Sequence, residues 1–116
     1  MMREPTPVEL VDAQLDAYNA RDLKRFLEPY ADDIEVFRAP AFQPVLFGKA
    51  SFGRYYAENR FNLPDLRAEV VSRIVAGNTV VDHERIHGLA DGVIEVAVVY
   101  RIVDGRIRTM HSFPSA

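Results

Sequence analysis

The sequence predicts an α+β fold in which three helices precede a set of long antiparallel strands. In the first half of the chain, apolar residues recur every three or four positions, which is the period of an amphipathic helix. From Leu66 onward the spacing changes to two, the period of a strand. Strands do not alternate with helices, and no Gly-rich phosphate loop is present, so a parallel nucleotide-binding sheet is not expected.

The first helix is expected to begin at a capping box. Thr6 can accept a hydrogen bond from the third helical residue, Pro7 suits the first turn, and Glu9 can reach back to the cap. The apolar stripe that follows consists of Val8, Val11, Leu15 and Tyr18.

Two shorter helices and one strand are expected next. Asp22 can cap a helix that Pro29 ends, and residues 34–37 alternate as a strand does. A third helix is expected after Gly48 and ends at Asn62-Leu63-Pro64. Its inward residues are predicted to be Phe52, Tyr55, Tyr56 and Asn59.

The second half of the chain predicts a meander of strands. Residues 66–75 alternate, with Leu66, Ala68, Val70, Ser72 and Ile74 on one face. Further strands are predicted over 79–87 and 93–103. Asp104-Gly105 is the strongest hairpin signal in the chain, and the last strand then runs to about Phe113.

Composition limits the classes of function. The 116 residues are enough for one domain, 1–116, and 48% hydrophobic with 27% charged residues is ordinary for a soluble protein. A net charge of −3 with scattered basic residues argues against a nucleic-acid partner. The chain has no cysteine, signal peptide or membrane-spanning run, so we expect a cytoplasmic protein without disulfides, Cys-ligated zinc or membrane contact.

The order of elements resembles the nuclear transport factor 2-like superfamily, which includes SnoaL-like polyketide cyclases and ketosteroid isomerases. The segments that carry this resemblance are Ala17–Leu23, Tyr30–Val36, Phe47–Lys49 and Val99–Ile107. The resemblance implies a cone-shaped, cystatin-like α+β roll, with three N-terminal helices packed in a curved, mostly antiparallel sheet. It also implies a largely apolar pocket for a small hydrophobic ligand, no cofactor, and a homodimer.

The resemblance does not extend to steroid isomerisation. That reaction needs a base, a tyrosine and a protonated aspartate. An ungapped alignment through Asp33 puts the tyrosine position on Gln14, the base position near Arg38 and the protonated-aspartate position on Val98. None of the three carries the required group, so this mechanism is disfavoured.

His83-Glu84-Arg85-Ile86-His87 matches the H-E-x-x-H signature of zinc proteases. On a helix the two histidines would lie roughly 6 Å apart and could share a zinc ion. On a strand they would lie about 13 Å apart and could not. The flanking turns and β-rich residues favour a strand, so no metal site is expected and a zinc hydrolase is a remote alternative.

The strand interpretation gives the two catalytic candidates. By the same alignment, the face with Val81, His83, Arg85 and His87 is expected to point into the cone. His83 could then act as a general acid or base, and Arg85 could stabilise an anion. The alternative is that these charges form cross-strand pairs with residues such as Arg73 or Glu95, or lie in a dimer interface.

The remaining pocket candidates come from helices and neighbouring strands. We expect the pocket to be lined by Gln14, Tyr18, Tyr55, Val98, Tyr100 and His87. Arg38 is placed near the pocket mouth, whereas His111 could face either side of the sheet. The leading hypothesis is a SnoaL-like isomerase, cyclase or hydrolase that acts on a hydrophobic ligand, and the alternative is a non-catalytic binding or dimerisation domain.

Overall fold

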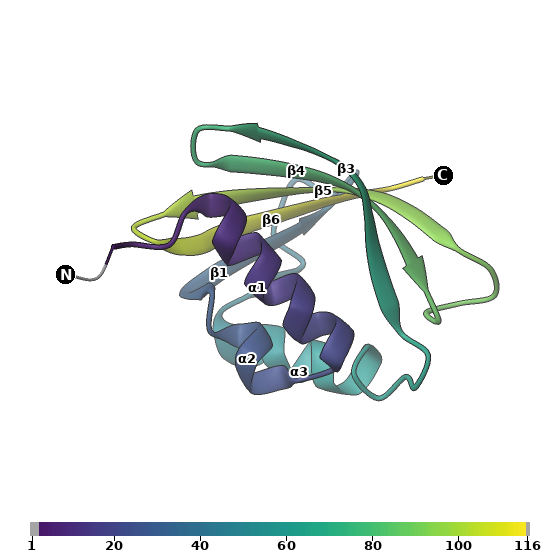
Figure 1. The fold of residues 1–116 in the computed structure, drawn as a ribbon. Coiled ribbons are helices and arrows are strands. Elements are labelled where there is room, and N and C mark those ends of the chain that lie inside the picture. Colours follow the sequence, from purple (N-terminus) through teal and green to yellow (C-terminus); the bar gives the residue numbers. More distant parts are fainter. Residues whose placement is uncertain (1–2, 116) are drawn as a thin grey trace.

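The computed structural model describes residues 3–115. Within these residues, three helices lie on one side of a bent six-stranded sheet (Figure 1). The helices are α1 (Pro7–Ala20), α2 (Leu23–Leu27) and α3 (Lys49–Asn59). The strands are β1 (Tyr30–Arg38), β2 (Leu46–Phe47), β3 (Arg67–Ala76), β4 (Thr79–His87), β5 (Ile94–Val103) and β6 (Arg106–Pro114). The predicted α+β class is confirmed.

The strands lie in the order β2-β1-β6-β5-β4-β3. Four of the five strand pairings in the described part of the chain are antiparallel, as expected for a mostly antiparallel sheet. The exception is the parallel pairing of β1 with β6, which places Val36 opposite Met110. The sequence does not predict this pairing, because the two strands are far apart in the chain and lack a local connection.

The start of α1 has the predicted capping box. Thr6 Oγ1 accepts from the Glu9 amide at 3.2 Å, and Glu9 Oε1 accepts from the Thr6 amide at 2.8 Å. The buried face of the helix differs from the predicted stripe: it comprises Leu10, Val11, Gln14, Ala17 and Tyr18, whereas Val8 and Leu15 are only half-buried. This face carries a polar side chain, Gln14, into the interior.

Aromatic side chains join the helices to the sheet. Phe26 of α2 stacks on Phe52 of α3 with ring centroids 5.6 Å apart, and Tyr30 at the start of β1 packs against both. Asp22 caps α2 as predicted, by accepting from the Arg25 amide at 3.2 Å. Asn59, which was expected to face the interior, is exposed instead, because it lies in the last turn of α3.

A β-bulge changes the alternation of β3. The register with β4 shifts between Val70 and Ser72, so residues before and after that point do not share one face. The single face predicted for residues 66–75 is therefore wrong beyond Val70. The bulge turns Arg73 inward, opposite Asp82 of β4, and leaves Ile74 66% exposed.

Candidate functional site

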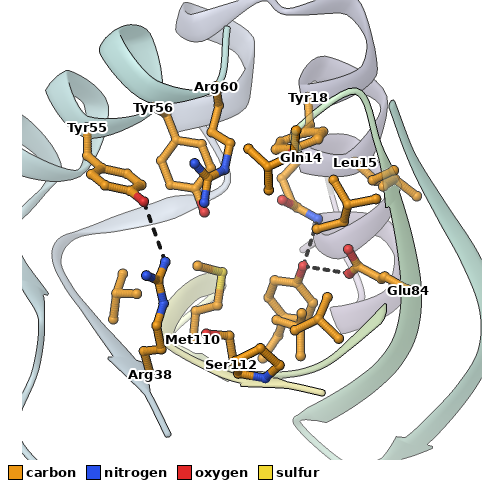
Figure 2. Close-up of a pocket in the computed structure, with 18 of the residues that line it drawn as sticks. Gln14, Leu15, Tyr18, Arg38, Tyr55, Tyr56, Arg60, Glu84, Met110 and Ser112 are labelled. Carbon is orange, nitrogen blue, oxygen red and sulfur yellow. Dashed lines mark hydrogen bonds between the residues drawn. The ribbon is translucent and has the colours of Figure 1, made fainter. Parts of the chain in front are cut away.

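A cavity of about 450 Å³ lies between the helices and the inner face of the sheet (Figure 2). Most of its lining is aliphatic or aromatic, and the charged lining residues are Arg38, Arg60 and Glu84. Of the expected pocket residues, those that line it are Gln14, Tyr18, Tyr55, Val98 and Tyr100. His87 does not. The cavity is apolar with a few polar groups, as binding sites for small molecules usually are.

The inner face of β4 is opposite to the one expected. Val80, Asp82 and Glu84 are buried, and they pair with Tyr100, Val98 and Val96 on the buried face of β5. His83 and Arg85 therefore lie on the outer face, away from the cavity. Val80 is completely buried, and the period of two then carries Asp82 and Glu84 inward with it.

The outward residues of β4 form cross-strand pairs. His83 Nε2 lies 2.8 Å from Oε1 of Glu95 on β5, and Arg85 Nε lies 3.4 Å from the same oxygen. His87 Nε2 lies 3.3 Å from Glu69 on β3. The proposed roles of His83 and Arg85 in the pocket are thus incorrect, and the cross-strand alternative describes the arrangement.

The H-E-x-x-H segment lies on a strand, as predicted, so its histidines are not one helical turn apart. Within residues 3–115, no group of three His, Asp or Glu side chains has the arrangement of a metal site. His111, whose side was left open, also lies outward. It stacks on Phe37 with ring centroids 4.3 Å apart and an interplanar angle of 5°.

Glu84 is the buried acid of the cavity. Its side chain faces the lining, and the residue is only 5% exposed. Burial raises the pKa of Glu84 to about 7, and the negative charge of Asp82 adds to this. The hydrogen bond from Tyr100 and the charge of Arg73 act in the opposite direction. A carboxyl group with this pKa can both accept and release a proton near neutral pH.

A chain of hydrogen bonds leads from the helices to Glu84. The Tyr30 hydroxyl donates to Gln14 Oε1 at 2.8 Å, and Gln14 Nε2 donates to the Tyr100 hydroxyl at 3.3 Å. The Tyr100 hydroxyl then donates to Glu84 Oε2 at 3.2 Å (Figure 2). All four residues are buried, so the network holds the carboxyl group in one orientation.

The second buried acid of β4 is neutralised by an ion pair. Arg73 Nε and Nη2 donate to Asp82 at 2.6 and 2.9 Å, and Arg73 Nη1 donates to Asp12 of α1 at 2.8 Å. These bonds raise the pKa of Arg73 above its usual range. Asp82 is therefore a structural anion, whereas Glu84 has no cation within 4.0 Å among the described residues.

The other side of the cavity carries two arginines and several tyrosines. Arg38 Nη2 lies 3.5 Å from the Tyr55 hydroxyl, and the Arg60 guanidinium lies 5.2 Å from the centre of the Tyr55 ring (Figure 2). Burial raises the pKa of Tyr18 to about 12 against the opposing charge of Arg60. Burial likewise raises the pKa of Tyr56, so both hydroxyls remain protonated and can donate.

The three positions compared with ketosteroid isomerases all line the cavity. Gln14, Arg38 and Val98 lie on its wall. The alignment therefore locates the cavity correctly, but no catalytic group of that mechanism occupies these positions. Glu84 was not among the sequence candidates, since the alternation of β4 supplies two equally polar faces. The available signal was Val80, an apolar residue in phase with Glu84 and Ile86.

The SnoaL-like domain family matches residues 11–110 of the chain. The chain belongs to this family. The match extends from the first helix into the last strand, and thus reaches every helix and strand that lines the cavity. No curated protein matches the chain.

Solved structures of other proteins have the same fold as this SnoaL-like chain. An NTF2-like protein of unknown function from Cytophaga hutchinsonii has a TM-score of 0.82 at 15% identity, with 99% of this chain and 95% of that chain covered. A SnoaL-like protein of unknown function from Burkholderia thailandensis has a TM-score of 0.79 at 24% identity, with coverage of 95% and 94%. A candidate ketosteroid isomerase from Kribbella flavida has a TM-score of 0.78 at 20% identity, with coverage of 92% and 76%.

Proposed function

We propose that this SnoaL-like domain binds a small, largely apolar molecule in its cavity and transfers a proton with Glu84, without a cofactor. The observation that carries the proposal is a buried carboxyl group that faces an apolar cavity and has a pKa of about 7. Burying such an acid without a cation costs stability, and perturbed acids of this kind concentrate at functional sites.

The chemistry that fits is proton movement at a carbon next to a carbonyl group. The Glu84 carboxylate takes a proton from that carbon, the electron pair moves onto the carbonyl oxygen as an enolate, and the protonated Glu84 returns the proton to another position. The Tyr56 hydroxyl belongs to the cavity lining, and burial keeps it protonated. It is thus available to donate to the enolate oxygen.

Isotope exchange tests this proposal without a known substrate. A panel of small cyclic ketones and 1,3-diketones is incubated with the protein in D₂O, and loss of the C–H signal next to the carbonyl is followed by NMR. We expect exchange of at least one compound, and a loss of roughly 100-fold or more in Glu84→Gln. Glu58→Gln is the matched control, because Glu58 is an exposed acid on α3 outside the lining. Full exchange by Glu84→Gln, or exchange of no compound by the wild type, contradicts the proposal.

The homodimer also remains a proposal, and the outer face of the sheet supports it. Phe37 and His111 stack there, and Ile74 and Phe113 are 66% and 47% exposed on the same face. An apolar surface of this kind favours association with a second copy. Sedimentation of the wild type and of Ile74→Glu tests it, since a dimer that buries this face dissociates in the variant. No helix within residues 3–115 is long and apolar enough to cross a membrane, and the cytoplasmic location stays a prediction.

A further inference from the structure

Two guanidinium groups point into the cavity from different elements. Arg38 comes from the end of β1, and Arg60 is the C-cap residue of α3. Figure 2 shows both side chains directed inward, with Tyr55 and Tyr56 beside them and Glu84 on the far wall. They are the cationic residues of the lining.

Neither guanidinium is neutralised by the protein. Within residues 3–115, no carboxylate oxygen lies within 4.0 Å of Arg38 or Arg60. Arg60 donates to the carbonyl of Asn59 at 3.0 Å, and Arg38 makes the long 3.5 Å contact with Tyr55. An arginine carries five N–H donors, so most donors of this pair remain free to bind a ligand.

The pKa of the Tyr55 hydroxyl responds to the positive potential between the two arginines. Burial alone would raise the pKa of its hydroxyl, yet the Arg38 contact and the charges of Arg60 and Arg38 outweigh burial and lower this pKa. The same groups would attract an anionic ligand atom placed beside the ring.

The charges of the lining set the charge of a complementary ligand. With Glu84 ionised, the two arginines leave an excess of one positive charge, which a monoanion balances. Guanidinium groups match the planar geometry of a carboxylate, and the bonds are charge-assisted. Most of the remaining lining is apolar, with residues such as Val98, Met110 and Leu46, and suits an uncharged hydrocarbon body.

We infer that the ligand of this cavity is a hydrophobic monocarboxylate. Its carboxylate binds Arg38 and Arg60 beside Tyr55, and its apolar body extends along the sheet toward Glu84. This inference rests on the proposed function and adds the substrate class to it.

Matched acids and amides test the inference. Benzoic, 2-naphthoic and 3-phenylpropionic acid are each compared with their primary amides, with Kd measured by calorimetry or by NMR titration. We expect the acid of at least one pair to bind about tenfold more tightly than its amide or better, which corresponds to one charge-assisted hydrogen bond. Arg38→Gln combined with Arg60→Gln should remove this preference, so that acid and amide bind with affinities within about twofold of each other. Arg54→Gln is the control, since Arg54 is exposed on α3 and outside the lining.

The outcomes separate this inference from the proposed function. Equal affinities of acid and amide, or a preference that survives both arginine substitutions, overturn the monocarboxylate while the Glu84 exchange test still stands. Binding of acids with no Glu84-dependent exchange supports the ligand class and contradicts the proton transfer. If no compound of any pair binds, the inference fails together with the binding part of the proposed function.

Discussion

The Tyr100 hydroxyl donates to Glu84 Oε2 across 3.2 Å and accepts from Gln14 at 3.3 Å. Its single proton is thus committed to Glu84, because the amide of Gln14 supplies the donor on the other side. This hydrogen bond favours the ionised form of Glu84 and opposes the effect of burial. Tyr100 therefore holds the pKa of Glu84 within reach of neutral pH.

Replacing Glu84 by Gln should stabilise the protein, and increasingly so as the pH rises. The pKa of Glu84 is raised from 4.5 to about 7 in the folded state. Between these values the folded chain keeps a proton that the unfolded chain has lost, so wild-type stability falls as the pH rises through this window. Keeping the ionised Glu84 buried lowers the unfolding free energy of the wild type by roughly 3 kcal/mol above pH 8, and this loss is absent below pH 4.

Thermal unfolding of both proteins at pH 5 and pH 8 measures this effect. The gain in Tm of Glu84→Gln over the wild type should be larger at pH 8. Glu58→Gln, which removes an exposed acid, should show no such dependence. A gain that is the same at both pH values would mean that Glu84 is not the buried acid described.

Tyr100→Phe should raise the pKa of Glu84 further. The substitution removes the only donor to this carboxyl within residues 3–115, while the ring still fills its place. NMR titration of the side-chain carboxyl carbon measures the shift. A pKa that falls or stays unchanged would contradict the role of this bond. Tyr55→Phe serves as control, because Tyr55 makes no contact with Glu84.

Arg73→Met should destabilise the fold strongly. It leaves Asp82, which has no exposed surface, without its two hydrogen-bond donors. Removing one partner of a buried ion pair costs about 3–5 kcal/mol. Arg85→Met removes an exposed arginine on the neighbouring strand and should cost less than about 1 kcal/mol. Urea unfolding measures the free energy of unfolding of both variants. Equal losses in Arg73→Met and Arg85→Met would contradict the difference in burial between the two ion pairs.

Gly88→Ala and Gly92→Ala form a matched pair. Both glycines have positive φ, +77° and +80°, so an alanine is strained at either position. A Cβ at Gly92 would meet no atom within 4 Å, whereas a Cβ at Gly88 would overlap the carbonyl group of Asp65. We expect a loss of about 1–2 kcal/mol at Gly92 and roughly 4 kcal/mol or more at Gly88. Similar losses of unfolding free energy for the two variants, measured in denaturant, would show that Gly88 does not lie close to the Asp65 carbonyl group.

His83→Ala should leave ligand affinity unchanged. His83 lies on the outer face and pairs with Glu95, so its removal does not alter the cavity wall. Titration of His83→Ala with any of the acids or ketones that bind the wild type measures this affinity. Glu84→Gln, which changes a residue of the inner face, is titrated for comparison. A tenfold loss of affinity in His83→Ala would place its ring in the cavity after all.

Local signals predict most of the fold. The capping box of Thr6 and Glu9, the cap at Asp22 and the Asp104-Gly105 hairpin depend on residues a few positions apart, and the structure contains all three. The bulge at Val70 and the parallel pairing of β1 with β6 depend on contacts between distant segments. Sequence periodicity carries no information about such contacts.

The site is less predictable for the same reason. Residues 80–87 carry charges at both phases of the alternation, so the signal for the buried face is weak and rests on Val80 and Ile86. The choice depends on Arg73, which the bulge directs inward to neutralise Asp82. Only then can the phase that contains Asp82 and Glu84 be buried.

The position of β6 has a consequence for biosynthesis. It is the last strand of the fold to leave the ribosome, yet it lies between β1 and β5 near the middle of the sheet. Until it emerges, β1 lacks its long neighbour, and the earlier strands expose unpaired edges. The pairing of strands in the sheet is therefore completed only after this segment is translated. Nascent chains that end before β6 are expected to require chaperone protection.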